Sequence, residues 1–491
     1  MNTICDFVVR RRLAILLVVA ALPRLWLAWF EHGTNHPDEI FQVLEPAHRF
    51  VYGFGIQTWE FRDGARSWFL PGIVALLWKC LAMLGLSDPL TVVPLLRMPF
   101  VALAVYAVYL AYRLAMRMVE DERAGDLAAL LAASAPLALL LDFRSTTEAA
   151  SAPLVLLALL ALLDGRTARA GAWLALLVFL RPTNAILGLA TMAWLLLTGK
   201  FRDSVRLVLG ALPVTLAGGL LDWITWGSPF HHLVEYVRFN WTESGERFGV
   251  EGPWSYGRTL LVTAPLIAVL LLPATAGLLR KWREARLPLV TGWLFLIFHS
   301  AIGHKEPRFL LPVVPLLAAL SGAGVFVWVS SWLDRLGIAR CARVTAMAVG
   351  GAAVFLCGLF YTIRLTYKDL QPLRHESHGR VLFGESNAVN RLLVEAGKQP
   401  NLCGLLLLGV VRNEIYSGGT TYLNRNVLLA SNPASEKAWV YLLAATNYII
   451  APASVRPSEW QPIAQRDNAV LSSRQGECVA LPETARPHYP R

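Results

Sequence analysis

The sequence predicts an all-α polytopic membrane protein with a small C-terminal extracytoplasmic α/β domain. Apolar runs of roughly 11 to 24 residues recur from Leu13 to Phe360, and a water-soluble fold has no interior large enough to bury them all. The 491 residues are 55% hydrophobic and only 16% charged, whereas a soluble domain carries about 25% charged residues. This composition excludes a disordered chain, a fibrous repeat and an ordinary cytosolic enzyme.

The first apolar segment is expected to be a retained transmembrane helix. It follows Arg10, Arg11 and Arg12, which are predicted to hold the N-terminus in the cytoplasm. A cleavable signal peptide would need small residues after a short apolar run, but Pro23 and Trp26 follow here.

Further apolar segments bring the expected total to about twelve helices, several of them shorter than the roughly 20 residues of a straight span. Short segments are tolerated where a helix packs inside a bundle or lines a cavity. The segments cover residues 69–86, 91–112, 126–142, 149–163, 170–180, 185–198, 206–221, 259–279, 287–303, 309–332 and 345–362.

Loop charge assigns the two sides of the membrane, because Arg-rich loops stay in the cytoplasm. The Arg-rich loops are 113–123, 166–169, 200–206, 280–286 and 335–343. The loops expected outside are 31–66, 142–148, 181–184, 222–258 and 299–308. Much of the net charge of +11 therefore marks topology. No basic stripe with interleaved aromatics indicates a nucleic-acid partner.

Twelve full crossings would place loop 299–308 inside, against this assignment. One segment between 66 and 112 is therefore expected not to span the membrane, for example because it is interfacial or re-entrant. About 11 or 13 transmembrane helices would both satisfy the loop charges.

The composition changes after about Leu365. We expect residues 1–365 to form the transmembrane module, with 31–66 as its first extracytoplasmic loop, and residues 366–491 to form the α/β domain. The same parity argument places this domain outside the cytoplasm.

Within the C-terminal domain, the segment 375–397 is predicted to contain a loop followed by a helix. Short β-type runs bounded by Gly, Asn and Pro cover 402–410, 420–429 and 446–452. Cys403 and Cys478 either form a disulfide, if the domain is extracytoplasmic, or remain two buried thiols.

The first outer loop carries adjacent carboxylates at Asp38 and Glu39. Adjacent carboxylates repel, so one can hold a proton more tightly, and a carboxylate within reach of a substrate hydroxyl can act as a general base. Asp38 can also cap a helix predicted over 38–50, and the two roles can coexist. Glu60 and Arg66 of the same loop are further candidates for binding substrate.

A second concentration of charge contains His304, Lys305, Glu306 and Arg308 between two apolar runs. These residues either anchor the topology by snorkelling and internal pairing or bind a phosphate, for which the Arg fork is suited. Arg181, in the RPTN run, lies either in a plain interhelical turn or in the same site.

The aromatic residues of loop 222–258 either form an interfacial belt or stack on a sugar and line a groove for a lipid tail. Motifs for other chemistries are missing. The sequence contains no Walker A loop, no G-x-G-x-x-G at a strand–helix junction, no H-E-x-x-H and no G-x-S-x-G. It also contains no Asp-x-Asp pair or metal-ligand cluster, so we expect no metal and no cofactor. ATP-driven pumping, nucleotide-sugar chemistry in a soluble fold and metalloprotease chemistry are disfavoured.

Four motifs together resemble the GT-C mannosyltransferases of glycosyltransferase family 22. They are HPDEIFQVLEPAHRFVYG followed by TWEF and by RS at 66–67, RPTN at 181–184, the stretch from Asp222 through FNW to FGVEGPWSYG, and HKEPRFLLPVVPLL. They occur in the order found in that family. The pattern is most similar to the glycosylphosphatidylinositol mannosyltransferases, with the asparagine-linked-glycan mannosyltransferases next.

This resemblance implies a multipass enzyme. The enzyme would transfer a sugar, with mannose expected, from a polyprenyl- or dolichyl-phosphate carrier to a hydroxyl of a lipid-linked or glycan acceptor. Transfer would proceed with inversion on the extracytoplasmic or lumenal face. The base of this family matches Asp38, with Glu39 beside it. Lys305 and Arg308 would lie near the carrier phosphate, with His304 and Glu306 orienting them.

The preference for Arg over Lys and the Ala/Leu-rich helices resemble a high-GC bacterial genome. We therefore expect a bacterial member in the inner membrane, surrounded by membrane lipids, with its site facing the periplasm. The endoplasmic reticulum membrane with a lumenal site is the alternative.

A transporter or flippase of polyprenyl-linked glycans is the alternative function, because broken helices would suit it. That function would favour internal repeats and ionisable residues at the midplane, whereas the charges here cluster in outer loops. A non-catalytic scaffold is a third hypothesis, which predicts that Asp38 and Lys305 can be replaced freely.

Overall fold

The computed structural model describes residues 2–34, 37–242, 249–281, 283–335, 340–366, 386–411, 416–432 and 435–480. The chain divides into two units. The first consists of Met1–Leu27 with Met98–Gly379, and the second of Ala28–Arg97 with Arg380–Arg491. The first outer loop thus groups with the C-terminal residues. The domain boundary at 365/366 stays a prediction.

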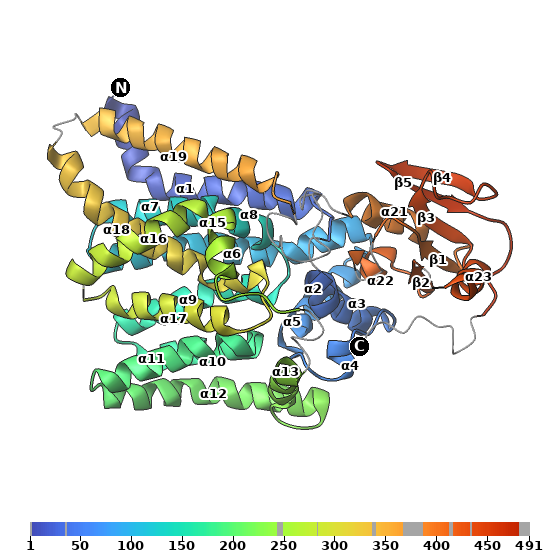
Figure 1. The fold of residues 1–491 in the computed structure, drawn as a ribbon, viewed down its shortest axis with the longest axis horizontal. Coiled ribbons are helices and arrows are strands. Elements are labelled where there is room, and N and C mark those ends of the chain that lie inside the picture. The colour runs from blue at the N-terminus through green and yellow to red at the C-terminus, as the bar shows by residue number, and fades with distance from the viewer. Residues whose placement is uncertain are drawn as a thin grey trace. The chain divides into compact units, whose positions relative to one another are not determined.

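Every apolar segment predicted between 91 and 362 contains a helix or a pair of helices (Figure 1). The first helix is α1 (Asn2–Phe30). The later helices are α6 (Pro89–Val119), α7 (Glu122–Ser134), α8 (Pro136–Leu141), α9 (Thr147–Leu163), α10 (Thr167–Leu180), η2 (Pro182–Asn184), α11 (Ala185–Leu197), α12 (Phe201–Trp226), α13 (His231–Thr242), α15 (Ser255–Thr263), α16 (Pro265–Lys281), α17 (Arg286–Ala301), η3 (Pro307–Val313), α18 (Val314–Arg335) and α19 (Arg340–Thr362).

Prolines divide two of the predicted segments. The segment 126–142 becomes α7 and α8, which are separated by the extended residue Ala135 before Pro136. The segment 259–279 becomes α15 and α16, which meet at a bend of 116° before Pro265. Proline lacks a backbone N–H and clashes with the preceding turn, so it can end or kink a helix. The segment 259–279 is therefore not one straight helix.

Within the described residues, four helices are long and apolar enough to cross a membrane, and the bent pair α15–α16 is a fifth if it counts as one span. The four cover Arg11–Phe30, Pro89–Val119, Phe201–Trp226 and Pro307–Ser330. Six shorter apolar helices in the described part of the chain have 10–17 residues. The polytopic character is thus confirmed, while the number of 11 to 13 spans stays a prediction.

Small residues allow close helix packing in the first unit. α10 and α12 pack on each other, and a Cβ atom at Gly171 would lie 2.0 Å from the carbonyl oxygen of Leu207. A Cβ at Gly210 would lie 1.8 Å from the carbonyl oxygen of Ala168. Glycine permits this approach of two backbones, as it does between helices in membranes. Elsewhere α18 packs against α7, α9 and α16 and is the most buried span.

In the second unit, a helical run extends from Pro37 to Tyr52, where a helix over 38–50 was predicted. The run consists of α2 (Pro37–Glu39), the π-helical turn η1 (Ile40–Leu44) and α3 (Glu45–Tyr52). α4 (Trp59–Arg62) and α5 (Phe69–Met83) follow. α5 is too short for a straight span. It buries Trp78 but exposes Leu76 and Met83, so it is our candidate for the segment that does not cross.

The C-terminal residues of the second unit form a mixed five-stranded sheet in the order β2-β1-β3-β5-β4. β1 pairs in parallel with β2 and β3, whereas β5 is antiparallel to β3 and β4. The strands are β1 (Gly404–Leu407), β2 (Leu428–Ser431), β3 (Tyr448–Pro452), β4 (Gln461–Arg466) and β5 (Ala469–Ser473). The helices are α21 (Asn387–Gly397), α22 (Gly419–Leu423) and α23 (Glu436–Ala445).

The predicted small α/β domain is confirmed, with two differences in detail. The run 420–429 begins as helix α22 and forms a strand only at its end. Thr421 and Tyr422 have high β propensity, but they are fully buried, and such tertiary contacts override propensity. The β4–β5 hairpin was not predicted. The predicted loop before α21 lies outside the described residues.

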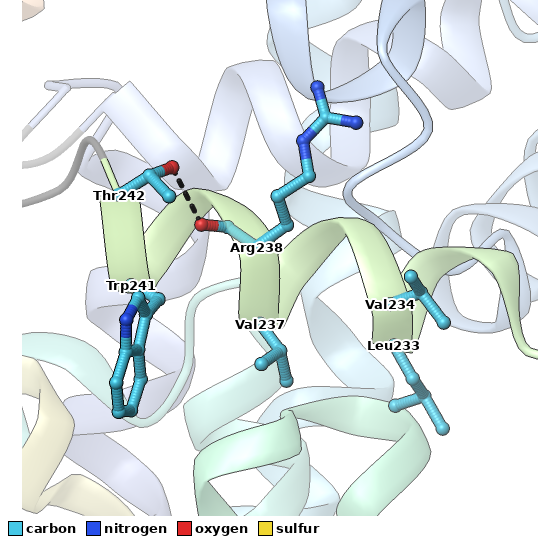
Figure 2. A pocket seen from close by; sticks show the side chains of 6 residues that line it. All are labelled: Leu233, Val234, Val237, Arg238, Trp241 and Thr242. Atoms are coloured by element: carbon cyan, nitrogen blue, oxygen red, sulfur yellow. Dashed lines mark hydrogen bonds between the residues drawn. The ribbon is translucent and has the colours of Figure 1, made fainter.

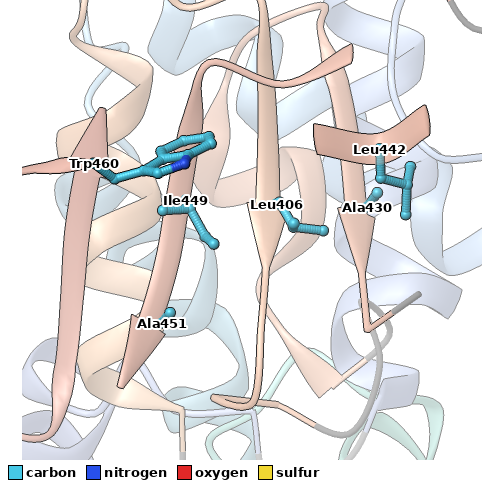
Figure 3. Close-up of a cluster of buried hydrophobic side chains, with 6 residues drawn as sticks. All are labelled: Leu406, Ala430, Leu442, Ile449, Ala451 and Trp460. Atoms are coloured by element: carbon cyan, nitrogen blue, oxygen red, sulfur yellow. The ribbon is translucent and has the colours of Figure 1, made fainter. Parts of the chain in front are cut away.

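The sheet has a compact apolar core on one face. Alternate strand residues point to the same face, and Leu406, Ala430, Ile449 and Ala451 pack there with Leu442 of α23 and with Trp460 (Figure 3). β1 and most of β3 are buried on both faces. Continuous apolar runs are typical of such strands, which explains why these two runs could be recognised in the sequence.

A disulfide joins Cys403, just before β1, to Cys478, with Cα atoms 6.0 Å apart. Of the two alternatives left open by the sequence, the structure contains the bonded pair. Disulfides persist in oxidising compartments.

Replacing Cys403 and Cys478 together by serine is expected to destabilise the C-terminal residues of the full-length protein by about 4 kcal/mol, because the bond closes a long loop in the unfolded chain. Denaturant unfolding followed by hydrogen exchange in β1 and β3 measures this loss. Alkylation of both thiols without prior reduction would contradict the pairing.

Candidate active site

The adjacent carboxylates of the first outer loop have different surroundings. Glu39 is fully buried, and its two oxygens accept hydrogen bonds from Nε and Nη2 of Arg97 at 2.7 and 2.8 Å. Asp38 lies in the first turn of α2 and is partly exposed. The Arg97 fork therefore holds Glu39 in a bidentate ion pair, whereas Asp38 keeps partial access to solvent.

Glu60 lies near Asp38 in the same unit. It is buried, and its Oε1 accepts a hydrogen bond from Nε2 of Gln42 at 3.1 Å. Burial raises the pKa of Glu60, because a carboxylate is poorly solvated there, and the charge of Asp38 raises this pKa further. Arg66 opposes the rise. The loop thus gathers three of the predicted residues, Asp38, Glu60 and Arg66, in one electrostatic neighbourhood.

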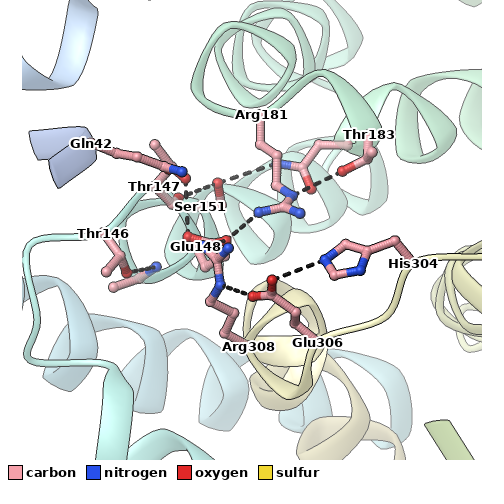
Figure 4. Close-up of polar contacts among 12 residues, drawn as sticks. Gln42, Thr146, Thr147, Glu148, Ser151, Arg181, Thr183, His304, Glu306 and Arg308 are labelled. Atoms are coloured by element: carbon pink, nitrogen blue, oxygen red, sulfur yellow. Dashed lines mark hydrogen bonds and ion pairs between the residues drawn. The ribbon is translucent and has the colours of Figure 1, made fainter. Parts of the chain in front are cut away.

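The first unit contains a buried cluster of charges that joins residues far apart in the sequence. Glu148, in the first turn of α9, lies between two guanidinium groups (Figure 4). Its Oε1 accepts hydrogen bonds from Nη1 of Arg181 and, at 2.8 Å, from Nη1 of Arg308. All three side chains are buried. The predicted association of Arg181 with the loop at 304–308 is thus present within this unit.

The HKEPRF loop adds a second carboxylate to this cluster. Glu306 accepts a hydrogen bond from Nε of Arg308 at 2.5 Å, and its other oxygen lies 2.9 Å from Nε2 of His304. The backbone N–H of Glu306 donates to the hydroxyl of Tyr256. Arg308 is therefore held by carboxylates on both sides, and Glu306 links it to His304.

An aromatic ring supports both arginines. The guanidinium carbon of Arg181 lies 3.8 Å from the ring centroid of Phe309, and that of Arg308 lies 5.0 Å from it. Such cation–π contacts are favourable and stronger where water is excluded. Together with the bond from Nε of Arg181 to Thr183 of η2, they hold the two forks in a defined orientation.

Lys305 differs from its charged neighbours in its partners. It is buried, and its Nζ donates to the backbone carbonyl oxygens of Ile302 and, at 2.8 Å, of Glu251. Burial lowers the pKa of Lys305, because the ammonium is poorly solvated, and the nearby Glu251 opposes this effect. The hydrogen-bond partners of this cation are thus neutral oxygens, whereas the arginines bond to carboxylates.

Glu148 is not among the site residues predicted from the sequence. It lies directly before the apolar segment predicted at 149–163, in the run RSTTE. The available signal was a single carboxylate at the start of a buried helix, which also suits an ordinary helix N-terminus. Only the fold reveals that two arginines, 33 and 160 residues later in the chain, share its oxygens.

The aromatic loop 222–258 contributes an apolar groove along α13 (Figure 2). It is lined by Leu233, Val234, Val237, Arg238, Trp241 and Thr242. Trp241 is exposed, so an interfacial belt and a contact with substrate both remain open for this loop. Among the described residues there is no group of three His, Cys, Asp or Glu side chains that could hold a metal ion.

Comparison with known proteins identifies the family. The model of the Alg9-like mannosyltransferase family matches residues 14–379. The chain belongs to this family.

Two relatives with similar sequences come from eukaryotes. The GPI mannosyltransferase 3 of Yarrowia lipolytica is 33% identical over 337 residues, which are 62% of this chain and 60% of that protein. The GPI alpha-1,2-mannosyltransferase 3 of Danio rerio is 26% identical over 341 residues, covering 66% of this chain and 60% of that protein. The chain thus spans about 60% of the length of these relatives.

The GT-C fold predicted for this Alg9-like protein is confirmed by solved structures. ArnT from Cupriavidus metallidurans bound to undecaprenyl phosphate superposes with a TM-score of 0.65 at 13% identity, covering 94% of this chain and 98% of ArnT. The oligosaccharyltransferase AglB from Archaeoglobus fulgidus, in complex with an inhibitory peptide and a dolichol-phosphate, gives 0.51 at 14% identity, with 91% and 70% covered. Both likenesses concern the fold. The helices that are long and apolar enough to cross a membrane support an integral membrane protein.

Replacing Glu148 by alanine is expected to destabilise this Alg9-like protein by about 3–5 kcal/mol, because two buried guanidinium groups lose a shared carboxylate. Thermal or denaturant unfolding in detergent measures the change.

The matched control is Glu235→Ala. Glu235 pairs with the exposed Arg238 at 3.5 Å, and such a surface pair contributes about 0–1 kcal/mol. Equal losses in the two variants would show that the buried cluster has no special role in stability.

Proposed function

We propose that the protein is a membrane mannosyltransferase that uses a polyprenyl- or dolichyl-phosphate sugar. Mannose would be transferred, with inversion, to a hydroxyl of a lipid-linked or glycan acceptor on the extracytoplasmic or lumenal face. Membership of the Alg9-like mannosyltransferase family supports the reaction class. The lipid phosphates named in the ArnT and AglB structures support the chemistry of the donor.

The observation that carries this proposal is the environment of Lys305. The neighbouring Arg181 and Arg308 are bound to carboxylates, so their charges are largely compensated. Nζ of Lys305 donates to two carbonyl oxygens, and an ammonium has three donors. A phosphate oxygen can take the third donor and bring the opposite charge to this buried cation.

In this proposal the arginines contribute mainly geometry and secondary electrostatic stabilisation. Arg308 and Arg181 are held by Glu148, and Glu306 connects Arg308 to His304. A rigid array of donors can stabilise the charge that develops on a leaving phosphate without reorganising during the reaction.

The transfer is a single in-line displacement. The oxygen of the acceptor hydroxyl forms a bond to the anomeric carbon while the bond from that carbon to the carrier phosphate oxygen breaks. The electron pair leaves with the phosphate, and the hydroxyl proton passes to a carboxylate base. We assign the base to Asp38, which is partly exposed, and a positioning role to Glu39, which is bound by Arg97.

Glu60 and Arg66 are proposed to bind substrate near this base. A raised pKa favours the protonated form of Glu60, which can donate a hydrogen bond to a sugar oxygen. Arg66 supplies a fork that suits a sugar or phosphate oxygen.

In this proposal the site faces the extracytoplasmic or lumenal side, because the charges of the loops predict that topology. The disulfide supports this location. A bacterial inner membrane with a periplasmic site would imply a bacterial polyprenyl carrier. The relatives described above are eukaryotic, and an endoplasmic reticulum membrane would imply a dolichyl carrier.

The transporter alternative is not favoured, because the family and these relatives are mannosyltransferases.

Asp38→Asn is expected to lower kcat about 10²- to 10⁴-fold, because the amide cannot accept the hydroxyl proton. Transfer from labelled polyprenyl-phosphate mannose, assayed in membranes, measures it. Asp63→Asn is the control, since Asp63 is an exposed aspartate of the same loop. Activity close to wild type in Asp38→Asn would refute the assignment of the base.

Lys305→Ala is expected to raise KM for the lipid-phosphate donor about tenfold or more, because one charged hydrogen bond to phosphate is lost. Lys398→Ala, at an exposed lysine, should leave KM unchanged. If the donor dependence of Lys305→Ala equals that of wild type, Lys305 does not bind the phosphate.

A further inference from the structure

Glu45 is a fully buried carboxylate in the first outer loop, and the mechanism above does not use it. Its Oε2 accepts hydrogen bonds from the backbone N–H of Thr421 at 2.9 Å and from the hydroxyl of Thr421 at 2.7 Å. Its Oε1 accepts from the backbone N–H of Ile56 at 2.8 Å. Two of these three donors come from α22, 376 residues later in the chain.

The backbone at two glycines packs closely against this carboxylate. Gly419 has φ of +57°, and a Cβ there would lie 3.2 Å from Oε2 of Glu45. A Cβ at Gly55 would lie 3.2 Å from Oε1 of Glu45 and 3.0 Å from the hydroxyl oxygen of Thr420. Glycine at both positions allows the backbone to surround the carboxylate.

Other contacts join the C-terminal residues to the same loop. Nδ2 of Asn390, in α21, donates to the carbonyl oxygen of His32 at 2.6 Å and to the hydroxyl of Thr34 at 3.1 Å. Oδ1 of Asn390 accepts from the N–H of Gly418 at 2.6 Å, which links α21 to the start of α22. Asn390 is fully buried. Further along the loop, Nε2 of His48 lies 3.1 Å from Oδ1 of Asn424.

These contacts lie on both sides of Asp38 in the sequence. His32 and Thr34 precede it, and Glu45 follows it by seven residues along the helical run of α2, η1 and α3. Seven residues are close to two helical turns, so restraining Glu45 also restrains the helix that carries Asp38. The C-terminal residues thus hold the loop before and after the proposed base.

We propose that α21 and α22 of the C-terminal residues form a clamp that positions the base of the reaction, with Glu45, Asn390 and Thr421 as its positioning residues. This inference rests on the proposed function, because it assumes that Asp38 acts on the acceptor hydroxyl. The clamp gives the C-terminal domain a role in catalysis without contact with the reacting atoms. Small displacements of a catalytic group are costly, since about 1 Å can lower the rate about 100-fold.

The test uses the full chain in lipid nanodiscs, with Glu45→Gln and Thr421→Val as the clamp variants. The Glu45→Gln change places an amide NH₂ group against N–H or hydroxyl donors, so hydrogen bonds that the carboxylate accepted are lost. The Thr421→Val change keeps the shape and the backbone donor and removes only the hydroxyl. Thr421→Ser restores the hydroxyl and is the rescue variant, and Glu459→Gln changes an exposed carboxylate of the same domain.

Two readouts are taken for each variant: kcat and KM with polyprenyl-phosphate mannose, and hydrogen exchange of residues 37–52. The clamp predicts that Glu45→Gln lowers kcat about 100-fold and that Thr421→Val lowers it about tenfold, with KM for the donor within about twofold of wild type. Exchange in 37–52 should quicken in both variants. Thr421→Ser and Glu459→Gln should behave as wild type.

If either clamp variant quickens exchange but leaves kcat unchanged, the clamp does not position the base and the inference is overturned. Unchanged exchange overturns it as well. An inactive wild type refutes the proposed function separately. In that case faster exchange in Glu45→Gln and Thr421→Val would still support a clamp on the loop, and unchanged exchange would still refute it.

Discussion

Charge burial inside a membrane protein is the constraint on which this structure depends. An ionised side chain away from water is costly unless charge and hydrogen bonds compensate it. Glu148 meets this requirement with two arginines, and Glu306 compensates Arg308 from the other side. Three segments must therefore fold together: the RPTN turn, the start of α9 and the HKEPRF loop. Glu148, at the start of α9, is the buried partner of Arg181 in the RPTN turn and of Arg308 in the HKEPRF loop.

The second unit follows the same rule with different partners. Arg97 compensates Glu39 in full, while hydrogen bonds to Thr421 and Ile56 solvate Glu45. Buried partners thus hold two carboxylates of the first outer loop. Asp38, next to Glu39 in the sequence, retains partial exposure, which suits a group that must exchange a proton with a substrate.

Much of this organisation could be predicted from the sequence, because it depends on composition and local pattern. Apolar length predicted the helices between 89 and 362, and buried β-type runs predicted β1 and β3. The predictions failed where neither hydropathy nor local propensity is sufficient. Pro265 bends a segment that hydropathy alone treats as continuous, and α22 forms a helix where Thr421 and Tyr422 favour a strand. Glu148 gave no local signal that separated it from an ordinary helix start.

The sequence by itself determined the class of the molecule and most of the candidate residues. Hydropathy depends on residue type alone, and Asp38, Arg181 and the charges at 304–308 stand out against an apolar background. Only the tertiary structure decided how these charges are used. It paired Glu39 with Arg97, placed Glu148 between two arginines and surrounded Lys305 with carbonyl oxygens. The reason is that compensation of a buried charge depends on distance in space, and partners separated by 54 to 160 residues leave no periodic signal in the chain.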